Sequence, residues 1–273
     1  MIREFQDYCR HNLGLAESTI SEYGKDLHYF VTWLQQTAGV QRWGSVTRST
    51  VEAWVRQQHE QGTQAATIKR RVSAVRRLYQ WAWLQGLCTE NPAKYVSTPK
   101  QAKRLPAVIP VEDITATVQD ARVNLATRFL ISVMTEAGLR ISEAISLDAS
   151  QFDTQRRSIK VTGKGNKERV VYYGDMTAQL LGKMMMCGKL TIDGSERNNR
   201  YDIWQALHTH TDAKKCNPHT LRHTFATTMV ENGASLESVS MLLGHESVQT
   251  TERYTHMGTQ AVVTNYQNCA PRL

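Results

Sequence analysis

Two histidines, an arginine and a tyrosine occupy one stretch, residues 217–256, near the end of this 273-residue chain. His219 and Arg222 form a His-x-x-Arg step, His245 follows, and Tyr254 lies nine residues further on. Together these side chains can attack a phosphodiester without a metal: the arginine holds phosphate oxygens, the histidines move protons, and the tyrosine is the nucleophile. Each alone is more often structural, because His-x-x-Arg steps also begin capped helices and such tyrosines usually pack. The prediction therefore depends on partners elsewhere in the chain.

Two further positions carry charges that suit such a site. Gly138 interrupts a helical pattern, so Arg140 falls at the start of the next helix, where its guanidinium and free backbone N–H groups can face an anion. The same pattern is also common on an ordinary helix–turn–helix surface. Glu143 is one turn further on and could hold a neighbouring cation in place. Lys164 lies at the tip of the glycine-rich turn 163–167; a turn lysine usually faces solvent, but one between two glycines can approach a phosphate closely.

The elements that would position these residues are mainly helical, with one small antiparallel β-sheet. Alternating or β-branched runs at 158–162 and 168–173 flank the Lys164 turn and predict a hairpin. Apolar residues at helical spacing, with cap signals such as Ser18 or Thr19, predict the helices. Their expected ranges are 2–10, 18–36, 47–61, 67–85, 111–121, 125–137, 175–186, 200–210, 220–232, 235–243 and 259–266, with a polar loop at 189–199.

The helix expected at 67–85 carries a basic face beside its apolar stripe. Residues 61–111 contain nine Lys or Arg against a single acid, Glu90. A solvated helix face usually mixes both signs of charge, so DNA phosphate is the economical partner for so one-sided a stretch, although a basic surface can arise by chance. The predicted DNA-contacting residues of this helix are Lys69, Arg70, Arg71, Arg76 and Arg77.

A proline-rich stretch divides the chain. Residues 91–110 hold four prolines and four basic residues without a helical period, which is typical of an interdomain linker. Lys100, Lys103 and Arg104 in this linker could lie along a DNA backbone. The predicted organisation is a helical domain at 1–90, this linker, and a second domain at 111–273.

Composition bounds the function. The net charge is +8 and the pI is near 9.3, which favours an anionic partner, either nucleic acid or a membrane surface. No apolar run approaches membrane-span length and no signal-peptide core is present, so we expect a cytoplasmic protein. The five cysteines are scattered, which predicts free thiols. There is no P-loop, G-x-G-x-x-G or H-E-x-x-H pattern, so nucleotide and zinc chemistry lack support.

The six candidate residues lie in four segments that resemble the tyrosine recombinase (phage integrase) family, and most of all its Xer-type recombinases: AGLRISEAISL, GKGNKER, HTLRHTFAT and LLGHESVQTTERYTH. The resemblance covers the whole second half, and more loosely the helical first half, which is similar to the family's core-binding domain. The stretch between the Lys164 hairpin and His219 is shorter than is usual in that family.

The resemblance implies a role for each residue. Tyr254 would form a 3′-phosphotyrosyl link, Arg140 and Arg222 would clamp the scissile phosphate, and Lys164 would protonate the departing 5′ oxygen. His219 and His245 would assist proton transfer and phosphate binding, with Glu143 as support. The physics agrees, because nearby guanidiniums favour the phenolate of a tyrosine whose ordinary pKa is about 10. Keeping the bond energy in phosphotyrosine requires no metal, ATP or other cofactor.

The resemblance also implies an assembly. Two domains would clamp duplex DNA, and four protomers would exchange strands through a Holliday junction. The C-terminal tail, with Ala261, Val262 and Tyr266 on its apolar face, would pack on the neighbouring subunit. Two alternatives stay open: a type IB topoisomerase-like nicking-closing enzyme, and a non-catalytic DNA-binding regulator with the same fold.

Overall fold

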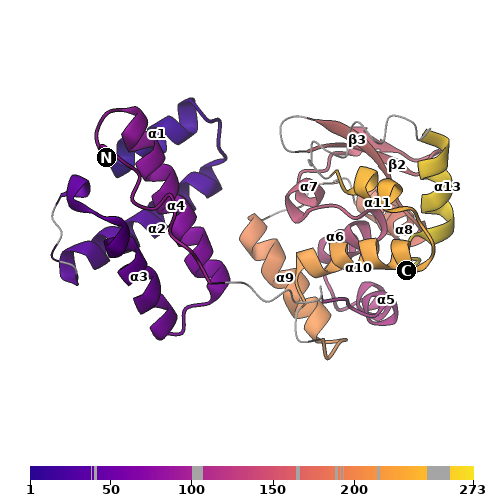
Figure 1. The fold of residues 1–273 in the computed structure, drawn as a ribbon. Coiled ribbons are helices and arrows are strands. Elements are labelled where there is room, and N and C mark those ends of the chain that lie inside the picture. The colour runs from indigo at the N-terminus through magenta and orange to yellow at the C-terminus, as the bar shows by residue number, and fades with distance from the viewer. Residues whose placement is uncertain are drawn as a thin grey trace. The chain divides into compact units, whose positions relative to one another are not determined.

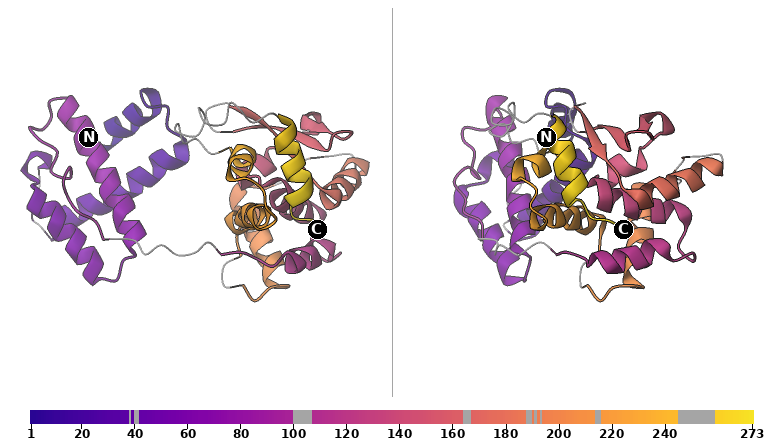
Figure 2. Two further views of the ribbon diagram at one scale, coloured as in Figure 1. Left: turned by 45° about the vertical axis from the view of Figure 1, so that its right-hand side comes forward. Right: turned by 90° about the vertical axis from the view of Figure 1, so that its right-hand side faces the viewer.

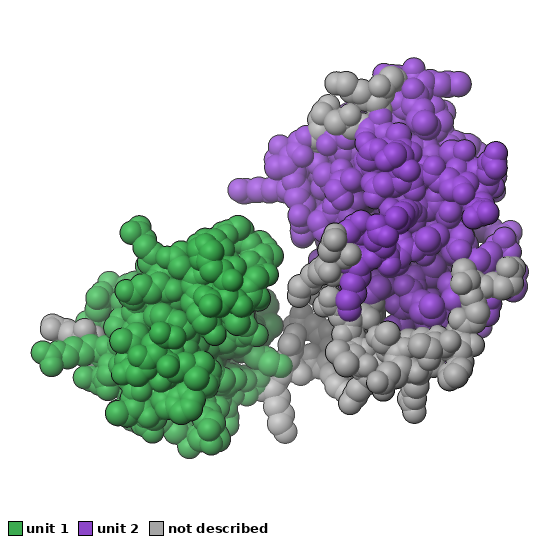
Figure 3. All heavy atoms as spheres, turned by 90° about the horizontal axis from the view of Figure 1, so that it is seen from above, with its two compact units in different colours: residues 1–104 green, residues 105–273 purple. Residues whose placement is uncertain are grey.

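The structure is a computed structural model that divides the chain into two compact units, Met1–Arg104 and Leu105–Leu273 (Figure 3). It describes every residue except 38, 40–41, 100–106, 164–166, 188–189, 191, 193, 214–215 and 245–258, together with the side chains of 259 and 260. The division falls inside the predicted linker. That linker is shorter than expected, because Ala93 and Val96 are buried in the core of the first unit and Ile109 in the core of the second.

The first unit is a helical bundle. Its elements are α1 (Ile2–His11), α2 (Glu17–Gln36), the 3-10 turn Trp43–Ser45, α3 (Arg48–Glu60) and α4 (Ala65–Leu84). The apolar stripe expected on α4 is buried, as are the apolar faces of α2 and α3 that meet it. The prediction that Ser18 or Thr19 caps α2 is wrong, because the helix begins earlier, at Glu17 after Ala16. Glu17 then occupies the first turn, where its charge suits the positive helix end.

The second unit is built around α6 (Leu125–Ala137), which runs through its middle (Figure 1). Every residue from Phe129 to Ala137 is buried, so this part of the helix is enclosed on all sides. It packs against α5 (Val111–Gln119), α7 (Ile141–Ile145), α8 (Asp175–Met186), α9 (Glu196–His208) and α10 (Pro218–Glu231). The remaining described helices are the 3-10 turn Ala149–Gln151, α11 (Leu236–Leu243) and α13 (Thr259–Cys269).

The predicted sheet is present and small. It has the order β1 (Phe152–Asp153), β2 (Ser158–Thr162) and β3 (Glu168–Tyr172), all antiparallel. Ser158 pairs with Tyr172 and Thr162 with Glu168, which places the turn of the hairpin at 163–167. The mostly helical fold with one small antiparallel sheet is therefore confirmed.

The predicted end of the polar loop at 189–199 is wrong. Helix α9 begins at Glu196, because Ser195 caps it by accepting a hydrogen bond from the backbone N–H of Asn198. Glu196 and Arg200 add an i,i+4 ion pair on the exposed face. The first turn is polar all round, so it has no apolar period that would reveal a helix.

The C-terminal helix α13 packs on its own unit, beside α10 and α11 (Figure 2). Val262, Tyr266 and Cys269 are buried in one cluster with residues of those helices, whereas Ala261 is exposed. Asn265 donates a hydrogen bond to Ser238 at 2.8 Å. In the single chain this apolar face therefore packs on a surface of its own unit. The expected packing on a neighbouring subunit stays a prediction.

No helix in the described part of the chain is both long and apolar enough to cross a lipid bilayer.

Candidate active site

Arg140 is placed by the sharp junction between α6 and α7. Gly138 ends α6 in the left-handed region at φ 64°. A β-carbon there would lie 2.5 Å from the Phe225 ring, so both the conformation and the space require glycine. Leu139 is buried, and Arg140 follows at the start of α7 with its side chain 36% exposed. The backbone N–H of Arg140 was expected to be free for an anion, but it donates to Glu143 at 2.8 Å.

Arg222 lies one turn into α10, which Asn217 caps by accepting from the backbone N–H of Thr220. Its side chain is only 9% exposed. The guanidinium donates to the carbonyl of Gly138 at 2.7 Å and to that of Leu243 at 2.5 Å. These carbonyls end α6 and α11, and the negative end of a helix suits a cation. Burial, followed by the charge of Arg140, lowers the pKa of Arg222 to about 10, so it stays protonated at neutral pH.

Glu143 binds the arginines of the site together. It is 7% exposed and accepts two bonds from Arg140, one from the backbone and one from Nη1 at 2.9 Å. Arg169 donates to both carboxylate oxygens, at 3.0 and 2.8 Å, and Nη1 of Arg222 lies 3.9 Å away. Burial alone would raise the pKa of Glu143, but the bonds from Arg169 and Arg140 bring it down to about 2. The carboxylate is therefore charged at any physiological pH.

His219 joins these residues from the first turn of α10, one turn before Arg222 on the same helix face. Its pKa is lowered, first by partial burial and then by the positive charges of Arg200, Arg222 and Arg140. A neutral imidazole at neutral pH can accept a proton or a hydrogen bond. The structure thus brings Arg140, Glu143 and Arg222 together and places His219 one helix turn from Arg222, where it senses the charges of both arginines.

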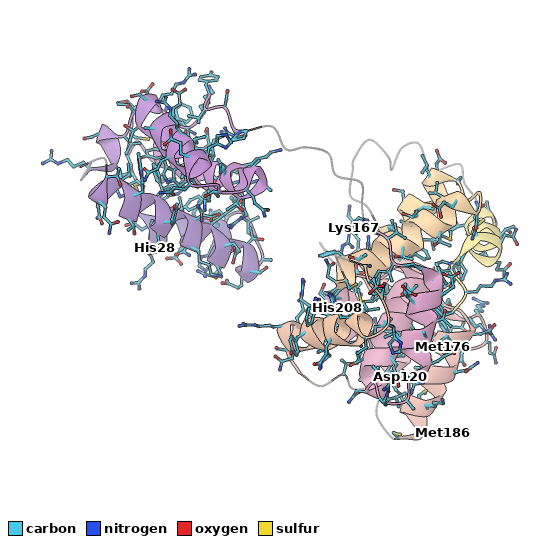
Figure 4. All side chains as sticks on the ribbon, turned by 90° about the horizontal axis from the view of Figure 1, so that it is seen from below. His28, Asp120, Lys167, Met176, Met186 and His208 are labelled. Carbon is cyan, nitrogen blue, oxygen red and sulfur yellow. The ribbon has the colours of Figure 1, made fainter. Side chains whose placement is uncertain are left out.

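Lys164, His245 and Tyr254 lie outside the described residues, but the residues next to two of them lie at the site. Gly163 precedes Lys164, and a β-carbon on it would lie 3.8 Å from Glu143. The backbone N–H of Gly163 donates to the carbonyl of Lys167 at 2.8 Å across the hairpin. Figure 4 labels Lys167. Gly244 precedes His245, and its carbonyl accepts from Arg140 at 3.4 Å. The chain therefore enters both segments from the arginine cluster.

Arg169 is the residue of this cluster that the sequence analysis missed. It lies on β3, where alternate residues face inward, as the buried Val171 two positions later shows. A charged residue at an inward position of a short strand was the available signal, because such a charge must find a partner.

The arrangement can bind one phosphate group through two arginines. Three arginines surround one carboxylate, so the described cluster carries two uncompensated positive charges. Each guanidinium has five N–H donors, and Arg140 and Arg222 each keep donors beyond those bound to protein. Among the described residues, no three His, Cys, Asp or Glu side chains lie close enough to hold a metal ion.

The basic residues predicted to contact DNA from α4 divide by their partners. Lys69 and Arg77 are exposed, and the Arg77 guanidinium lies 5.8 Å from the ring centre of Tyr23. Arg70 is 44% exposed and donates to Glu22 at 3.0 Å and to Asp26 at 2.7 Å. A DNA contact by these three residues stays a prediction.

Arg71 and Arg76 are half-buried and brace the bundle. Arg71 donates to Gln58 at 2.8 Å and lies 3.9 Å from the ring centre of Tyr29. Arg76 donates to the carbonyls of Ala93 and Val96, which hold the segment after α4 against the first unit. The two side chains thus have structural partners that the charge pattern did not reveal. Lys100, Lys103 and Arg104 lie outside the described residues.

Comparison with known proteins agrees with this architecture. The model of the Phage integrase family matches residues 109–260, and that of the Phage integrase, N-terminal SAM-like domain matches residues 2–86. Tyrosine recombinase XerD of Lacticaseibacillus casei is 31% identical over 296 aligned residues, which cover 100% of this chain and 99% of the relative. Tyrosine recombinase XerC of Haemophilus influenzae is also 31% identical, over 99% of this chain and 97% of the relative.

Solved structures share the fold at lower identity. The XerH site-specific recombinase bound to a palindromic difH substrate, in a post-cleavage complex, has a TM-score of 0.72 at 20% identity and covers 95% of this chain and 82% of that chain. The Tn1549 transposon integrase in complex with circular intermediate DNA has a TM-score of 0.68 at 19% identity, over 96% and 97%. With one family model spanning more than half of its length and relatives at 31% identity covering it throughout, the chain belongs to the phage integrase family and is a tyrosine recombinase of the Xer type.

Proposed function

We propose that this site-specific DNA recombinase cleaves and rejoins strands at the arginine cluster of its second unit. The observation that carries the proposal is the set of contacts around Glu143, which places Arg140 and Arg222 together with free donors. The cluster lies between Gly163 and Gly244, the residues that precede Lys164 and His245. In this proposal, Lys164 and His245 act on a phosphate held there.

The chemistry assigns one step to each group. The phenolic oxygen of Tyr254 attacks phosphorus and forms the 3′-phosphotyrosyl bond, while the bond to the 5′ oxygen breaks. Lys164 gives that oxygen its proton, and the two arginines neutralise the charge that develops on the phosphoryl oxygens. His219, whose pKa is lowered, is neutral and can accept the phenol proton or a hydrogen bond. Attack by the 5′ hydroxyl of another strand reverses these steps and completes the exchange.

The recombination activity implies more than one protomer, because strand exchange joins two sites. We propose that four protomers act on paired sites through a Holliday junction. Each would clamp duplex DNA between its two units, with the α4 cations and the linker residues Lys100, Lys103 and Arg104 along the backbone. Helix α13 would then exchange from its own unit to the same surface of a neighbour, where Val262 and Tyr266 would find the same contacts. No observation favours the topoisomerase-like or the non-catalytic alternative.

The test uses a duplex selected from a random-sequence library by the immobilised wild-type protein. Tyr254→Phe removes one oxygen and little volume, so binding to this duplex should survive while the covalent protein–DNA adduct disappears. The adduct is measured by its mobility in a denaturing gel. An adduct of undiminished yield would show that the nucleophile has been assigned to the wrong residue.

A further inference from the structure

The side chain of Arg169 is enclosed in a way that the reaction described above does not explain. It is 12% exposed, although it lies on a short strand at the edge of the small sheet. A buried ion pair is costly to desolvate, and a well-packed apolar residue often serves stability equally well. The fold alone therefore gives no reason for an arginine at this position.

Arg169 joins three parts of the active site with one guanidinium. Nη1 and Nη2 hold both oxygens of Glu143, at 3.0 and 2.8 Å. Nε donates to the carbonyl of Leu242 at 3.0 Å, near the end of α11. A lysine could supply the charge but not this planar set of three donors.

The same guanidinium lies between two glycines that border the catalytic segments. A β-carbon on Gly163 would lie 3.4 Å from Nη1 of Arg169, and one on Gly244 would lie 3.0 Å from its Cδ. The chain can approach Arg169 this closely on both sides because these two residues lack side chains. Lys164 and His245 directly follow these glycines, so the position of Arg169 bears on both.

The orientation of Glu143 also decides how many arginine donors remain for phosphate. With both carboxylate oxygens held by Arg169, Glu143 lies 3.9 Å from Arg222 and takes only one side-chain donor of Arg140. Without Arg169, the buried carboxylate would satisfy itself by drawing closer to these two arginines. Those are the donors that the proposed function assigns to the phosphate.

We infer that Arg169 is a positioning residue for DNA cleavage: it fixes Glu143 away from Arg222, thereby aims Arg140, and anchors the end of α11 next to His245. This inference rests on the proposed function of the site. Arg169 touches neither the phosphate nor the leaving oxygen in this account, and it acts through Glu143 and the Leu242 carbonyl.

The test compares Arg169→Gln and Arg169→Lys with Glu168→Gln, an exposed neighbour on the same strand that pairs with Lys160 on the solvent side. Adduct formation on the library-selected duplex is measured at saturating protein, together with duplex affinity and melting temperature. Both Arg169 variants should cleave roughly 10²-fold more slowly, as a small misplacement of catalytic groups does, while duplex affinity stays near that of wild type. Glu168→Gln should cleave like the wild type.

A pH profile separates positioning from a merely structural role. The charged groups that face Glu143 in the described chain are Arg140 on α7, Arg169 on β3 and Arg222 on α10. Removing Arg169 leaves Glu143 buried with fewer partners, so its pKa should rise and cleavage by Arg169→Gln should fall as the pH is lowered. The double variant Arg169→Gln with Glu143→Gln should lack this acid-dependent loss.

Three results would overturn the inference while leaving the proposed function intact. The first is a wild-type cleavage rate in both Arg169 variants while Arg222→Ala is inactive. The second is an acid profile that is unchanged in Arg169→Gln. The third is failure of both variants to fold, which would make Arg169 a structural residue only. Adduct formation by Tyr254→Phe would instead refute the proposed function itself.

Discussion

Each unit holds a buried carboxylate that faces arginines, yet the pKa values of these two carboxylates are shifted in opposite directions. Asp26 in the first unit is 3% exposed, and burial raises its pKa by more than Arg70 and Arg71 lower it. Glu143 in the second unit is 7% exposed, and its pKa falls to about 2. Arg70 approaches Asp26 at 2.7 Å, but Arg71 stays at 3.9 Å. Glu143 accepts four hydrogen bonds, so hydrogen bonding rather than mere proximity decides the outcome.

The balance of charge differs as well. On the first unit, Lys25, Arg70 and Arg71 meet two carboxylates, Glu22 and Asp26, so the network has one excess positive charge, and its Lys25 and Arg70 are exposed to water. Around Glu143, three arginines meet one carboxylate. A partly buried excess of positive charge is costly unless an anion arrives, which fits the proposed phosphate site at the second cluster, whereas the first cluster braces α2 against α4.

The largest expected difference between the clusters concerns cleavage. Arg222→Ala removes one of the two phosphate clamps, which should cost roughly 3–4 kcal/mol of transition-state stabilisation, or about 10²–10³ in rate. Arg70→Ala should weaken DNA binding and change its salt dependence, with cleavage at saturating protein affected far less. Adduct formation on the library-selected duplex measures both. Equal rate losses in the two variants would mean that the clusters do not differ in kind.

The next difference concerns acid. The pKa of Glu143 lies near 2 in the folded chain, below its ordinary 4.5. Its charged form therefore stabilises the fold fully above that ordinary value, and this contribution, on the order of 3 kcal/mol, is lost as the pH falls toward 2. Hydrogen exchange of the α7 and β3 amides in the full chain should show the loss. Glu143→Gln should remove this pH dependence, and a variant that keeps it would place the titration on another group.

The helix junction beside the cluster is the third point of comparison. Gly138 and Gly62 both have positive φ, at 64° and 74°, but a β-carbon meets the Phe225 ring at Gly138 and nothing within 4 Å at Gly62. Alanine should strain the backbone at both positions, while only Gly138→Ala also overpacks the core, at a further cost of about 1–3 kcal/mol. Melting of the two variants measures the difference. Equal destabilisation would mean that Phe225 yields without cost.

These contrasts mark what the sequence could reveal. The sequence predicted both ends of α6 and α8 correctly, because the spacing of apolar residues is a local signal. It also predicted the helix junction at Gly138, because a glycine that breaks a helix is a local signal too. Arg140 and Arg222 were identified because they lie in the segments AGLRISEAISL and HTLRHTFAT, which resemble the tyrosine recombinase family. Arg169 was not, since its partner Glu143 is 26 residues away and meets it only once β3 packs beside α7.

Charge patterning in the first unit was equally incomplete. It identified the basic face of α4 but not the partners of Arg71 and Arg76, which come from α2, α3 and the segment after α4. A run of like charges along one helix says nothing about the acids and carbonyls that other elements bring to it. Packing of the tail helix α13 on its own unit was missed for the same reason, because the surface that receives it is assembled from two other helices.

The smallest expected effect is that of Asp26→Asn, and it tests the comparison most directly. Because the pKa of Asp26 is raised in the folded chain, the folded state holds its proton more tightly than the unfolded state. Folding of the first unit therefore gains from Asp26 as the pH falls through its raised pKa, opposite in sign to Glu143. Asparagine is neutral at every pH and keeps an oxygen for Arg70, so the loss at neutral pH should be below about 1 kcal/mol.

The measurement is hydrogen exchange of the α2 and α4 amides in the full chain across the acid range. Wild-type protein should show these helices gaining protection relative to Asp26→Asn as the pH falls. A variant that unfolds the first unit at neutral pH would show that Asp26 holds its arginines as strongly as Glu143 does. In that case the two clusters would differ only in their excess of positive charge. Hydrogen bonding would then not explain why the pKa values of Asp26 and Glu143 are shifted in opposite directions.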